Sequence, residues 1–223
     1  MIRQAGTSMP HLQDQLDEIT SNTRSLVQPE RLAIGERAVE ELLLSGIEEK
    51  ILPVGATVPS FELPDSTGRT VRSEDLLALG PLVIDFFRGR WCPYCVTELE
   101  AWRDLYPIIR DHGGLLIGIS PQTIRQSDFM QGQHSIPYPL LHDSGCSVAE
   151  TFGLTYAIPE FQQQYYRNIL VNIPFVNGDQ TWKLLLPATY VVGTDGKVLF
   201  AEAHADFRVR PEPEDVLRHL PRS

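Results

Sequence analysis

The 223-residue chain has little of several features that mark whole classes of protein. Its 3 cysteines are too few for a disulfide framework. Lys and Arg number 19 against 29 Asp and Glu, and the net charge of −10 argues against nucleic acid, because phosphate binding needs a basic face. No apolar run approaches the roughly 18 residues of a membrane helix, and Met1 to Gln13 lacks the apolar core of a signal peptide. We therefore expect no membrane partner and a cytoplasmic location with reduced thiols.

Two units are expected along the chain. Residues 1–50 form an N-terminal helical extension, because apolar residues recur at helical spacing on both sides of Pro29 and Gly46 suits the position just beyond the second helix. Its apolar faces either cover the chain's own core, the commoner use of such a face, or make a homodimer. Residues 51–223 form the main domain.

The main domain alternates strands with helices after a short hairpin at 61–63 and 70–72. Strands are expected at 82–87, 115–119, 140–142, 189–192 and 198–203, and helices at 96–110, 124–134, 147–152 and 212–220. This order predicts an α/β fold with a central mixed sheet flanked by helices.

A segment at about 155–186 does not follow this alternation. It is expected to hold a helix at 160–170 and a loop at 172–179. Long insertions of this kind are often lids, but a surface excursion is equally compatible. Its aromatic residues either wall a pocket or form a small core of their own; they are Tyr165, Tyr166, Phe175 and Trp182.

The strongest chemical signal is Trp91-Cys92-Pro93-Tyr94-Cys95, which follows an expected strand and opens an expected helix. Cysteines three apart at a helix start lie on one face, so the sulfurs of Cys92 and Cys95 can meet. Pro93 suits the first helical turn, and with Tyr94 it is expected to make a rigid exposed turn. The helix N-terminus favours the Cys92 thiolate, the form that attacks disulfides and peroxides, and Cys95 should be less exposed.

Two other uses of this pair are conceivable. A zinc site would form if His142 and Cys146 completed four ligands, but the sequence has no second C-x-x-C, and a strand–turn–helix context fits redox chemistry better. An inert buried pair fits an exposed turn poorly. Cys146 is either a resolving thiol or, more commonly for a lone cysteine in a reduced compartment, a small packed residue. We expect no metal and no cofactor beyond a Cys92–Cys95 disulfide.

The motifs together resemble a known family. Leu82-Val-Ile-Asp-Phe-Phe followed by Trp91-Cys-Pro-Tyr-Cys resembles the strand and active-site turn of thioredoxin. The wider pattern resembles peroxiredoxins of the alkyl hydroperoxide reductase and thiol-specific antioxidant family, with Cys95 on the peroxidatic cysteine. The matching runs are Thr97-Glu98-Leu99, Pro139-Leu-Leu-His-Asp-Ser-Gly, Ala188-Thr-Tyr-Val-Val and Asp195-Gly-Lys-Val. The resemblance covers about residues 54–204 and implies a thioredoxin-like fold.

The chain also departs from that family. Arg88 stands where the family has proline, Cys92 stands in place of its Thr or Ser, and Pro187 stands where it has a distant arginine. Pro187 instead resembles the cis-proline of thioredoxins, which packs against the C-x-x-C. The site thus resembles a peroxiredoxin body that carries a thioredoxin redox pair, and Arg88 either replaces the lost arginine or faces solvent.

The resemblance leaves two mechanisms open. In one, Cys92 attacks a disulfide and Cys95 resolves the mixed disulfide. In the other, Cys95 attacks a hydroperoxide and Cys92 condenses with the sulfenic acid. A thioredoxin-like or glutathione-type reductant would restore the dithiol. The expected function is that of a thiol-dependent antioxidant oxidoreductase; the alternative is a redox-sensing or partner-binding module switched by the same pair.

Supporting residues are expected around the pair. Trp91 should pack beside it and contact substrate, and Thr189 lies in the run that follows Pro187. Asp85 resembles the buried aspartate that serves thioredoxin as a proton acceptor. Its spacing to Cys92 is one residue longer, which reverses its face unless a bulge intervenes, so an Asp85 turned to solvent is equally compatible.

Overall fold

The protein is described by a computed structural model over residues 11–221, so the expectation about Met1 to Gln13 falls almost wholly outside it. The helices are α1 (Leu12–Leu26), α2 (Pro29–Leu44), α3 (Ser73–Leu79), α4 (Pro93–Asp111), α5 (Ile124–His134), α6 (Ser147–Thr151), α7 (Glu160–Asn168), α8 (Ile173–Asn177) and α9 (Pro213–Val216). The strands are β1 (Glu62–Pro64), β2 (Thr70–Arg72), β3 (Leu82–Phe86), β4 (Leu115–Ser120), β5 (Leu140–His142), β6 (Thr155–Ala157), β7 (Lys183–Leu185), β8 (Ala188–Val192) and β9 (Val198–Ala203).

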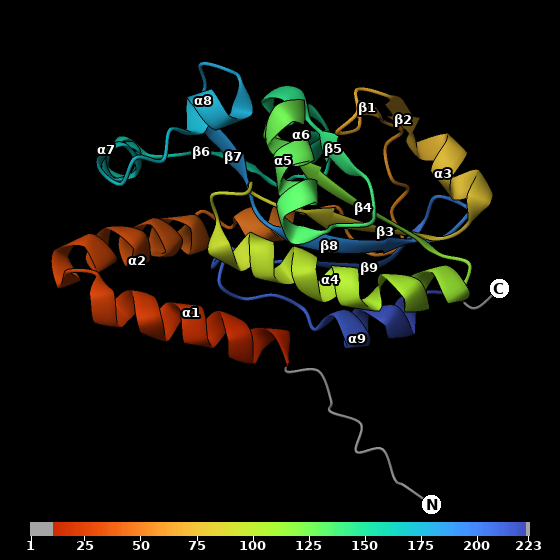
Figure 1. The fold of residues 1–223 in the computed structure, drawn as a ribbon, viewed down its shortest axis with the longest axis horizontal. Coiled ribbons are helices and arrows are strands. Elements are labelled where there is room, and N and C mark those ends of the chain that lie inside the picture. Colours follow the sequence, from red (N-terminus) through yellow and green to blue (C-terminus); the bar gives the residue numbers. More distant parts are fainter. Residues whose placement is uncertain (1–10, 222–223) are drawn as a thin grey trace, which may run out of the picture.

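The central sheet has five strands in the order β5-β4-β3-β8-β9. Strands β3, β4 and β5 run parallel, while β8 is antiparallel to both β3 and β9. The predicted mixed sheet flanked by helices is therefore confirmed, and the late hairpin supplies its antiparallel edge. The carboxyl end of β3, in the middle of the sheet, leads directly into the cysteine turn (Figure 1).

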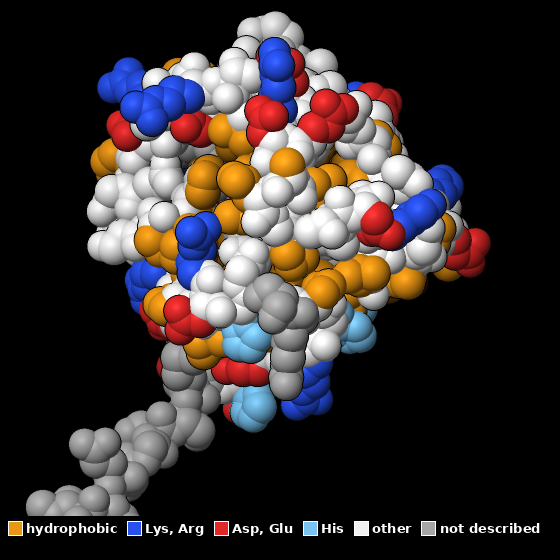
Figure 2. All heavy atoms as spheres, turned by 90° about the vertical axis from the view of Figure 1, so that its right-hand side faces the viewer, with side chains coloured by type: hydrophobic (Ala, Val, Ile, Leu, Met, Phe, Trp, Pro, Cys, Tyr) orange, Lys and Arg blue, Asp and Glu red, His pale blue; other side chains and the backbone are white. Residues whose placement is uncertain are grey.

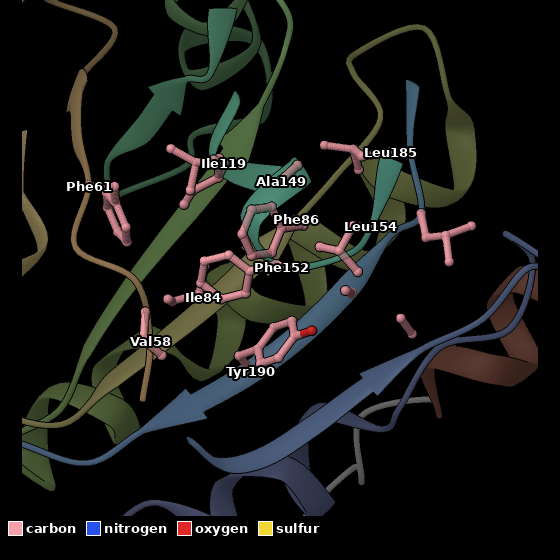
Figure 3. Close-up of a cluster of buried hydrophobic side chains, with 14 of the residues drawn as sticks. Val58, Phe61, Ile84, Phe86, Ile119, Ala149, Phe152, Leu154, Leu185 and Tyr190 are labelled. Atoms are coloured by element: carbon pink, nitrogen blue, oxygen red, sulfur yellow. The ribbon is translucent and has the colours of Figure 1, made fainter. Parts of the chain in front are cut away.

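One face of the sheet carries an apolar core. Figure 3 shows its aromatic centre, where Phe86 of β3 and Tyr190 of β8 meet Phe152, which directly follows α6. The ring centroids of Phe86 and Phe152 lie 4.9 Å apart, and those of Phe152 and Tyr190 lie 5.1 Å apart. Tilted and edge-on contacts of this kind stabilise a core beyond the area they bury. The side chains that alternate with Ile84 and Phe86 along β3 point to the opposite face of the sheet, toward α4.

Helix α1 of the N-terminal extension packs on the side of the sheet that carries α4 (Figure 1). Leu12 and Leu16 of α1 are buried in the same cluster as the side chains of α4. The carboxylate of Glu212 accepts the first two N–H groups of α1, both at 2.9 Å, and so caps a helix whose own N-cap residue offers no side-chain bond. Helix α2 packs against α7.

The insertion is more ordered than its sequence suggested. The helix expected at 160–170 is α7, but the loop expected at 172–179 contains α8, so that part of the prediction is wrong. Five residues are too few for helical periodicity to show; Pro174 and the Asn172 side chain, which accepts the N–H of Phe175 at 3.2 Å, start this helix. The pairing of β6 with β7 closes the insertion and was not predicted.

None of the helices in the described part of the chain is long and apolar enough to cross a membrane. On the face seen from the right-hand side of Figure 1, apolar, acidic and basic side chains are interspersed (Figure 2).

Candidate active site

The two cysteines lie in a tight turn between β3 and α4. Cys92 directly precedes α4, and its backbone N–H donates to the carbonyl oxygen of Gly89 at 3.1 Å. Pro93 is the first helical residue, where its missing N–H costs no helix hydrogen bond. Gly89 has a φ of +140°, and a Cβ there would lie 2.8 Å from the indole nitrogen of Trp91. The turn therefore requires glycine at this position.

Both thiols are free and buried, with exposed fractions of 1% for Cys92 and 0% for Cys95. The side chain of Cys95 donates a hydrogen bond to the sulfur of Cys92. The sulfur of Cys95 accepts the backbone N–H of Arg88 at 3.5 Å and lies 3.8 Å from Nη2 of Arg210. The expected difference in exposure is thus slight, and the two sulfurs differ instead in the groups that face them.

These groups make the pair electrostatically asymmetric. Burial opposes ionisation of Cys92, but the hydrogen bond from Cys95 and the charges of Arg88 and Arg210 outweigh it and lower the pKa of Cys92 to about 6. Burial raises the pKa of Cys95, and its hydrogen bond to Cys92 and the charge of that thiolate raise it further. The two ionisations are linked, because a charge on one thiol opposes ionisation of the other. Cys92 has the lowered pKa and is therefore the thiol that is charged near neutral pH.

Arg88 is 1% exposed, so the solvent-facing alternative is wrong. Its guanidinium carbon lies 4.7 Å from the ring centroid of Trp91 and 4.2 Å from that of Phe207. It also donates to the hydroxyl of Tyr166, which α7 supplies. A planar guanidinium is well suited to stacking between aromatic rings. The negative groups that act on it are Cys92, Cys95 and nearby phenols rather than a carboxylate.

Asp85 and Thr189 lie behind the pair, directly opposite each other on β3 and β8. Both are fully buried, so an Asp85 turned to solvent is wrong. Burial raises the pKa of Asp85, and the charges of Glu98 and Cys95 add to this. The spacing from Asp85 to Cys92 is one residue longer than in thioredoxin, and this additional residue lies in the turn. Strand β3 ends at Phe86 without a bulge, so the alternation of side chains stops before the additional residue and does not reverse the face of Asp85.

Sequence reasoning missed an ion pair beside Cys95. Nε of Arg210 lies 2.6 Å from Oε2 of Glu98, and both side chains are at most 2% exposed. Burial raises the pKa of Glu98 to about 7 although Arg210 opposes the shift. Glu98 stands three residues after Cys95, so the helical repeat alone places it on the same face. No local sequence pattern predicts the position of Arg210, which lies 112 residues from Glu98 in the chain.

Tyr94 is also placed differently from the expectation. Pro93 is exposed, but Tyr94 is only 7% exposed and its hydroxyl lies 3.1 Å from Oγ1 of Thr20 in α1. Its ring meets Phe207 edge-on at 5.4 Å. The prediction of an exposed turn is therefore wrong for Tyr94, because a helix 74 residues earlier in the chain covers it.

Pro187 is buried between β7 and β8, and the expectation of a cis peptide bond is wrong, since none of the described residues has one. The N–H of Leu186 donates to the carbonyl oxygen of Leu154 at 2.8 Å, and β8 begins at Ala188. The chain thus runs from one strand pairing straight into the next, and a trans bond is the ordinary, lower-energy form for that path.

Cys146 belongs to the apolar core on the opposite face of the sheet from the Cys92–Cys95 pair. Burial raises its pKa to about 12. Nδ1 of His142 donates to the carbonyl oxygen of Gln122 at 2.7 Å. Across residues 11–221 no group of three or more His, Cys, Asp or Glu side chains is arranged to hold a metal ion. The structure therefore brings neither residue to the pair.

A cavity of about 210 Å³ opens beside Cys92. Helix α2 forms one wall, α7 another, and Phe207 with the turn residues the third. Apolar side chains dominate its lining: Leu32, Val39, Trp91, Tyr165, Tyr166 and Phe207. Cys92 and Arg88 are in this lining and Cys95 is not. The insertion therefore walls the site, while Tyr166 also belongs to the small core of the insertion.

Comparison with known proteins agrees with this arrangement. The model of the AhpC/TSA family matches residues 54–201. A protein assigned as a peroxiredoxin in Mycobacterium tuberculosis H37Rv is 31% identical over 162 residues, which span 70% of this chain and 92% of that protein. Peroxiredoxin Bcp of Bacillus subtilis is 26% identical over 114 residues, or 51% of this chain and 72% of that protein.

Comparison with a solved structure also agrees with this family. The crystal structure of peroxidoxin BcpB from Mycobacterium tuberculosis superposes with a TM-score of 0.59 and 27% identity, covering 75% of this chain and 96% of that one. The five-stranded mixed sheet is thus the thioredoxin-type sheet of peroxiredoxins. The chain belongs to the AhpC/TSA family and is a thiol-dependent oxidoreductase of the peroxiredoxin kind.

Proposed function

We propose that the protein reduces hydroperoxides with Cys92 as the attacking thiolate and Cys95 as the resolving thiol. One observation carries this assignment: Cys92 lines the cavity together with the buried Arg88, whereas Cys95 does not line it. The order is the reverse of the one implied by aligning Cys95 with the peroxidatic cysteine of the family. This reversed order keeps the peroxidase activity but assigns the first step to Cys92 instead of Cys95.

In the first step the Cys92 thiolate attacks the terminal oxygen of a hydroperoxide ROOH. A sulfur–oxygen bond forms and the O–O bond breaks, so Cys92 becomes a sulfenic acid, and the departing RO⁻ takes up a proton as the alcohol. Negative charge moves from sulfur to oxygen during this step. Arg88 is fixed by Trp91, Phe207 and Tyr166 beside that path and can stabilise the developing charge without rearrangement.

In the second step Cys95 condenses with the sulfenic acid, giving the Cys92–Cys95 disulfide and water. Ionisation of Cys95 is opposed first by burial, then by its hydrogen bond to Cys92 and by the Cys92 charge. Oxidation of Cys92 removes that charge, so the pKa of Cys95 falls just when its thiolate is needed. The N–H of Arg88 and the guanidinium of Arg210 remain to support the anion.

Asp85 acts on the proton of Cys95 in this scheme, and the ion pair Glu98–Arg210 acts as a positioning group. Asp85 has two buried carboxylate oxygens without a hydrogen-bond partner in the described structure, and its raised pKa suits a group that exchanges a proton with Cys95. Trp91 and Tyr94 shape the approach to Cys92, and Thr189 lies beside Asp85. Transfer of electrons from a thiol donor then restores both thiols, and a cytoplasmic setting would supply such donors.

The test is a single turnover of the pre-reduced protein with hydroperoxide, followed by Trp91 fluorescence and by trapping of sulfenic acid. We expect Cys95→Ser to react and stop at the sulfenic acid of Cys92. We expect Cys92→Ser to lose the reaction by about 10³-fold or more, because a serine hydroxyl is not ionised at neutral pH.

Cys146→Ser is the matched control, since it removes the third thiol without touching the cavity. The assignment is wrong if Cys92→Ser still reduces peroxide at the native rate while Cys95→Ser does not. A reduced protein that hydroperoxide fails to oxidise, while small disulfides oxidise it rapidly, would remove the peroxidase function itself.

A further inference from the structure

Three arginines and one glutamate are among the residues that line the cavity beside Cys92. Arg88 lies in its wall, and Arg31 of α2 lies exposed at its lining without an ion-pair partner in the described part of the chain. Arg208 also borders it, but its charge is balanced by Glu36 and Asp206. Glu36, the carboxylate in this lining, is paired with Arg208, so Arg31 and Arg88 line one small cavity without a carboxylate partner, in a chain whose net charge is −10.

The balance of charge in the cavity changes with the redox state of the pair. In the dithiol form the Cys92 thiolate compensates Arg88. In the disulfide form that thiolate is gone, while Arg88 remains buried with its Nε unpartnered. A buried charge without a counter-ion is costly, so the disulfide form has a vacant place for an anion.

The size of the cavity restricts what can bring that anion. Its 210 Å³ is below the roughly 300–1,000 Å³ of sites that enclose a drug-sized ligand. The walls are tied together: two hydrogen bonds join Glu36 of α2 to Arg208, at 2.6 and 2.9 Å, and Arg37 of α2 stacks on Phe161 of α7 at 4.0 Å. A thiol on a protein surface cannot follow Cys92 into this space unless α2 or α7 moves away.

We propose that the Cys92–Cys95 disulfide is reduced by a low-molecular-weight thiol bearing a carboxylate, which enters this cavity, a proposal that rests on the function given above. The donor thiolate attacks Cys92, forming a mixed disulfide and releasing Cys95 as a thiolate. A second donor thiolate attacks the donor sulfur, which yields the donor disulfide and the Cys92 thiolate. Two donor thiols supply the two electrons. Arg31 and Arg88 hold the donor carboxylate.

The experiment compares three small thiols that differ in charge as reductants of the oxidised protein: 3-mercaptopropionate, 2-mercaptoethanol and cysteamine. Each rate is divided by that of the same thiol with the neutral disulfide of 2-mercaptoethanol, which removes intrinsic nucleophilicity. We expect the normalised rate of 3-mercaptopropionate to exceed that of cysteamine by about tenfold or more at low salt, and the ratio to shrink as salt is added.

Arg31→Gln should lower that ratio about threefold. The matched control is Arg110→Gln, which removes an exposed arginine at the far end of α4, about 22 Å from Cys95 at 1.5 Å per residue, and should leave the ratio unchanged. A bacterial thioredoxin at the same thiol concentration should reduce the disulfide more slowly than 3-mercaptopropionate. Equal normalised rates for the three thiols, or faster reduction by thioredoxin, would overturn the proposal.

The donor step can fail separately from the peroxidase function. Oxidation of the pre-reduced protein by hydroperoxide in a single turnover needs no donor. If that oxidation is rapid but the three thiols react alike, only the donor assignment is wrong. If hydroperoxide does not oxidise the reduced protein, the proposed function fails whatever the thiol series gives.

Discussion

The two faces of the central sheet each bury a cysteine and treat it differently. Cys146, on the face of the Phe86–Phe152 core, and Cys92, on the face of α4, are both 1% exposed. Burial raises the pKa of Cys146 to about 12, while the pKa of Cys92 is about 6 despite the same burial. What separates them is the surroundings: Cys92 has a thiol donor and two guanidinium groups, and Cys146 has none of these. Burial alone therefore raises the pKa of a thiol and makes it unreactive, and nearby positive charge reverses that rise.

The comparison extends beyond the cysteines. The apolar core around Phe86 packs rings and aliphatic side chains. The α4 face instead buries Asp85, Glu98 and Arg210, and several of their polar atoms have no partner among the described residues. A sheet that needed only stability would not bury such groups, because each unsatisfied one is costly. Their concentration behind Cys95 fits a site in which protons move between neighbouring groups.

Arg210→Met should have the largest effect of the changes that test this contrast. It leaves the buried Glu98 carboxylate without its counter-ion, and breaking a buried pair in this way costs about 3–5 kcal/mol of unfolding free energy. Denaturant unfolding monitored by tryptophan fluorescence gives that value. The double variant Glu98→Gln with Arg210→Met should be less destabilised than the single one. A loss below about 1 kcal/mol in Arg210→Met would mean that the pair behaves like a surface ion pair.

Arg88→Gln should have an intermediate effect, seen in the pH dependence of peroxide oxidation. The rate follows the fraction of Cys92 thiolate, so it should rise with pH around the pKa of about 6 and level off above it. Removing the Arg88 charge raises that pKa, so the midpoint of the profile moves to higher pH. The rate near pH 6 should then fall by about fivefold for the first pH unit by which the midpoint rises and by about tenfold for each further unit.

Arg90→Gln is the control for this profile. It removes the charge of an exposed arginine in the same turn, whose side chain pairs with Gln126 rather than with a cysteine. Its midpoint should match the unaltered protein. A midpoint near the ordinary thiol range in the unaltered protein would contradict the contrast with Cys146.

Sequence reasoning located what local patterns encode. The C-x-x-C turn, the five strands of the central sheet and the break before Pro29 all depend on residues within one or two helical turns of each other. The late hairpin around Asp195 and Gly196 is local in the same sense. The family resemblance extended these elements into the correct fold.

The failures share a different cause. Tyr94 is covered by Thr20, and Glu98 is paired with Arg210, across 74 and 112 residues of chain respectively. No periodicity or spacing in one segment reports such a contact, because it depends on how separate elements pack. The resemblance alone predicts a cis form of Pro187, whereas the strand pairings on either side of it fix the path of the chain. In this protein the helical repeat places Glu98 near Cys95, whereas the position of Arg210 comes from tertiary packing.

Cys146→Ala is the smallest test and the sharpest one of the contrast between the two faces. It removes a sulfur from the apolar core and leaves the cavity, Arg88 and Arg210 untouched. The vacated space should cost about 1 kcal/mol of unfolding free energy, at the low end of the range for core truncations. The peroxide oxidation rate should stay within about twofold, because an un-ionised thiol contributes nothing to attack. Thiol alkylation adds the third readout: the unaltered protein should lose its Cys92 thiol rapidly at pH 7 and its Cys146 thiol only on unfolding. If Cys146 were alkylated in the folded protein as fast as Cys92, the charges around Cys92 would not be what makes it reactive.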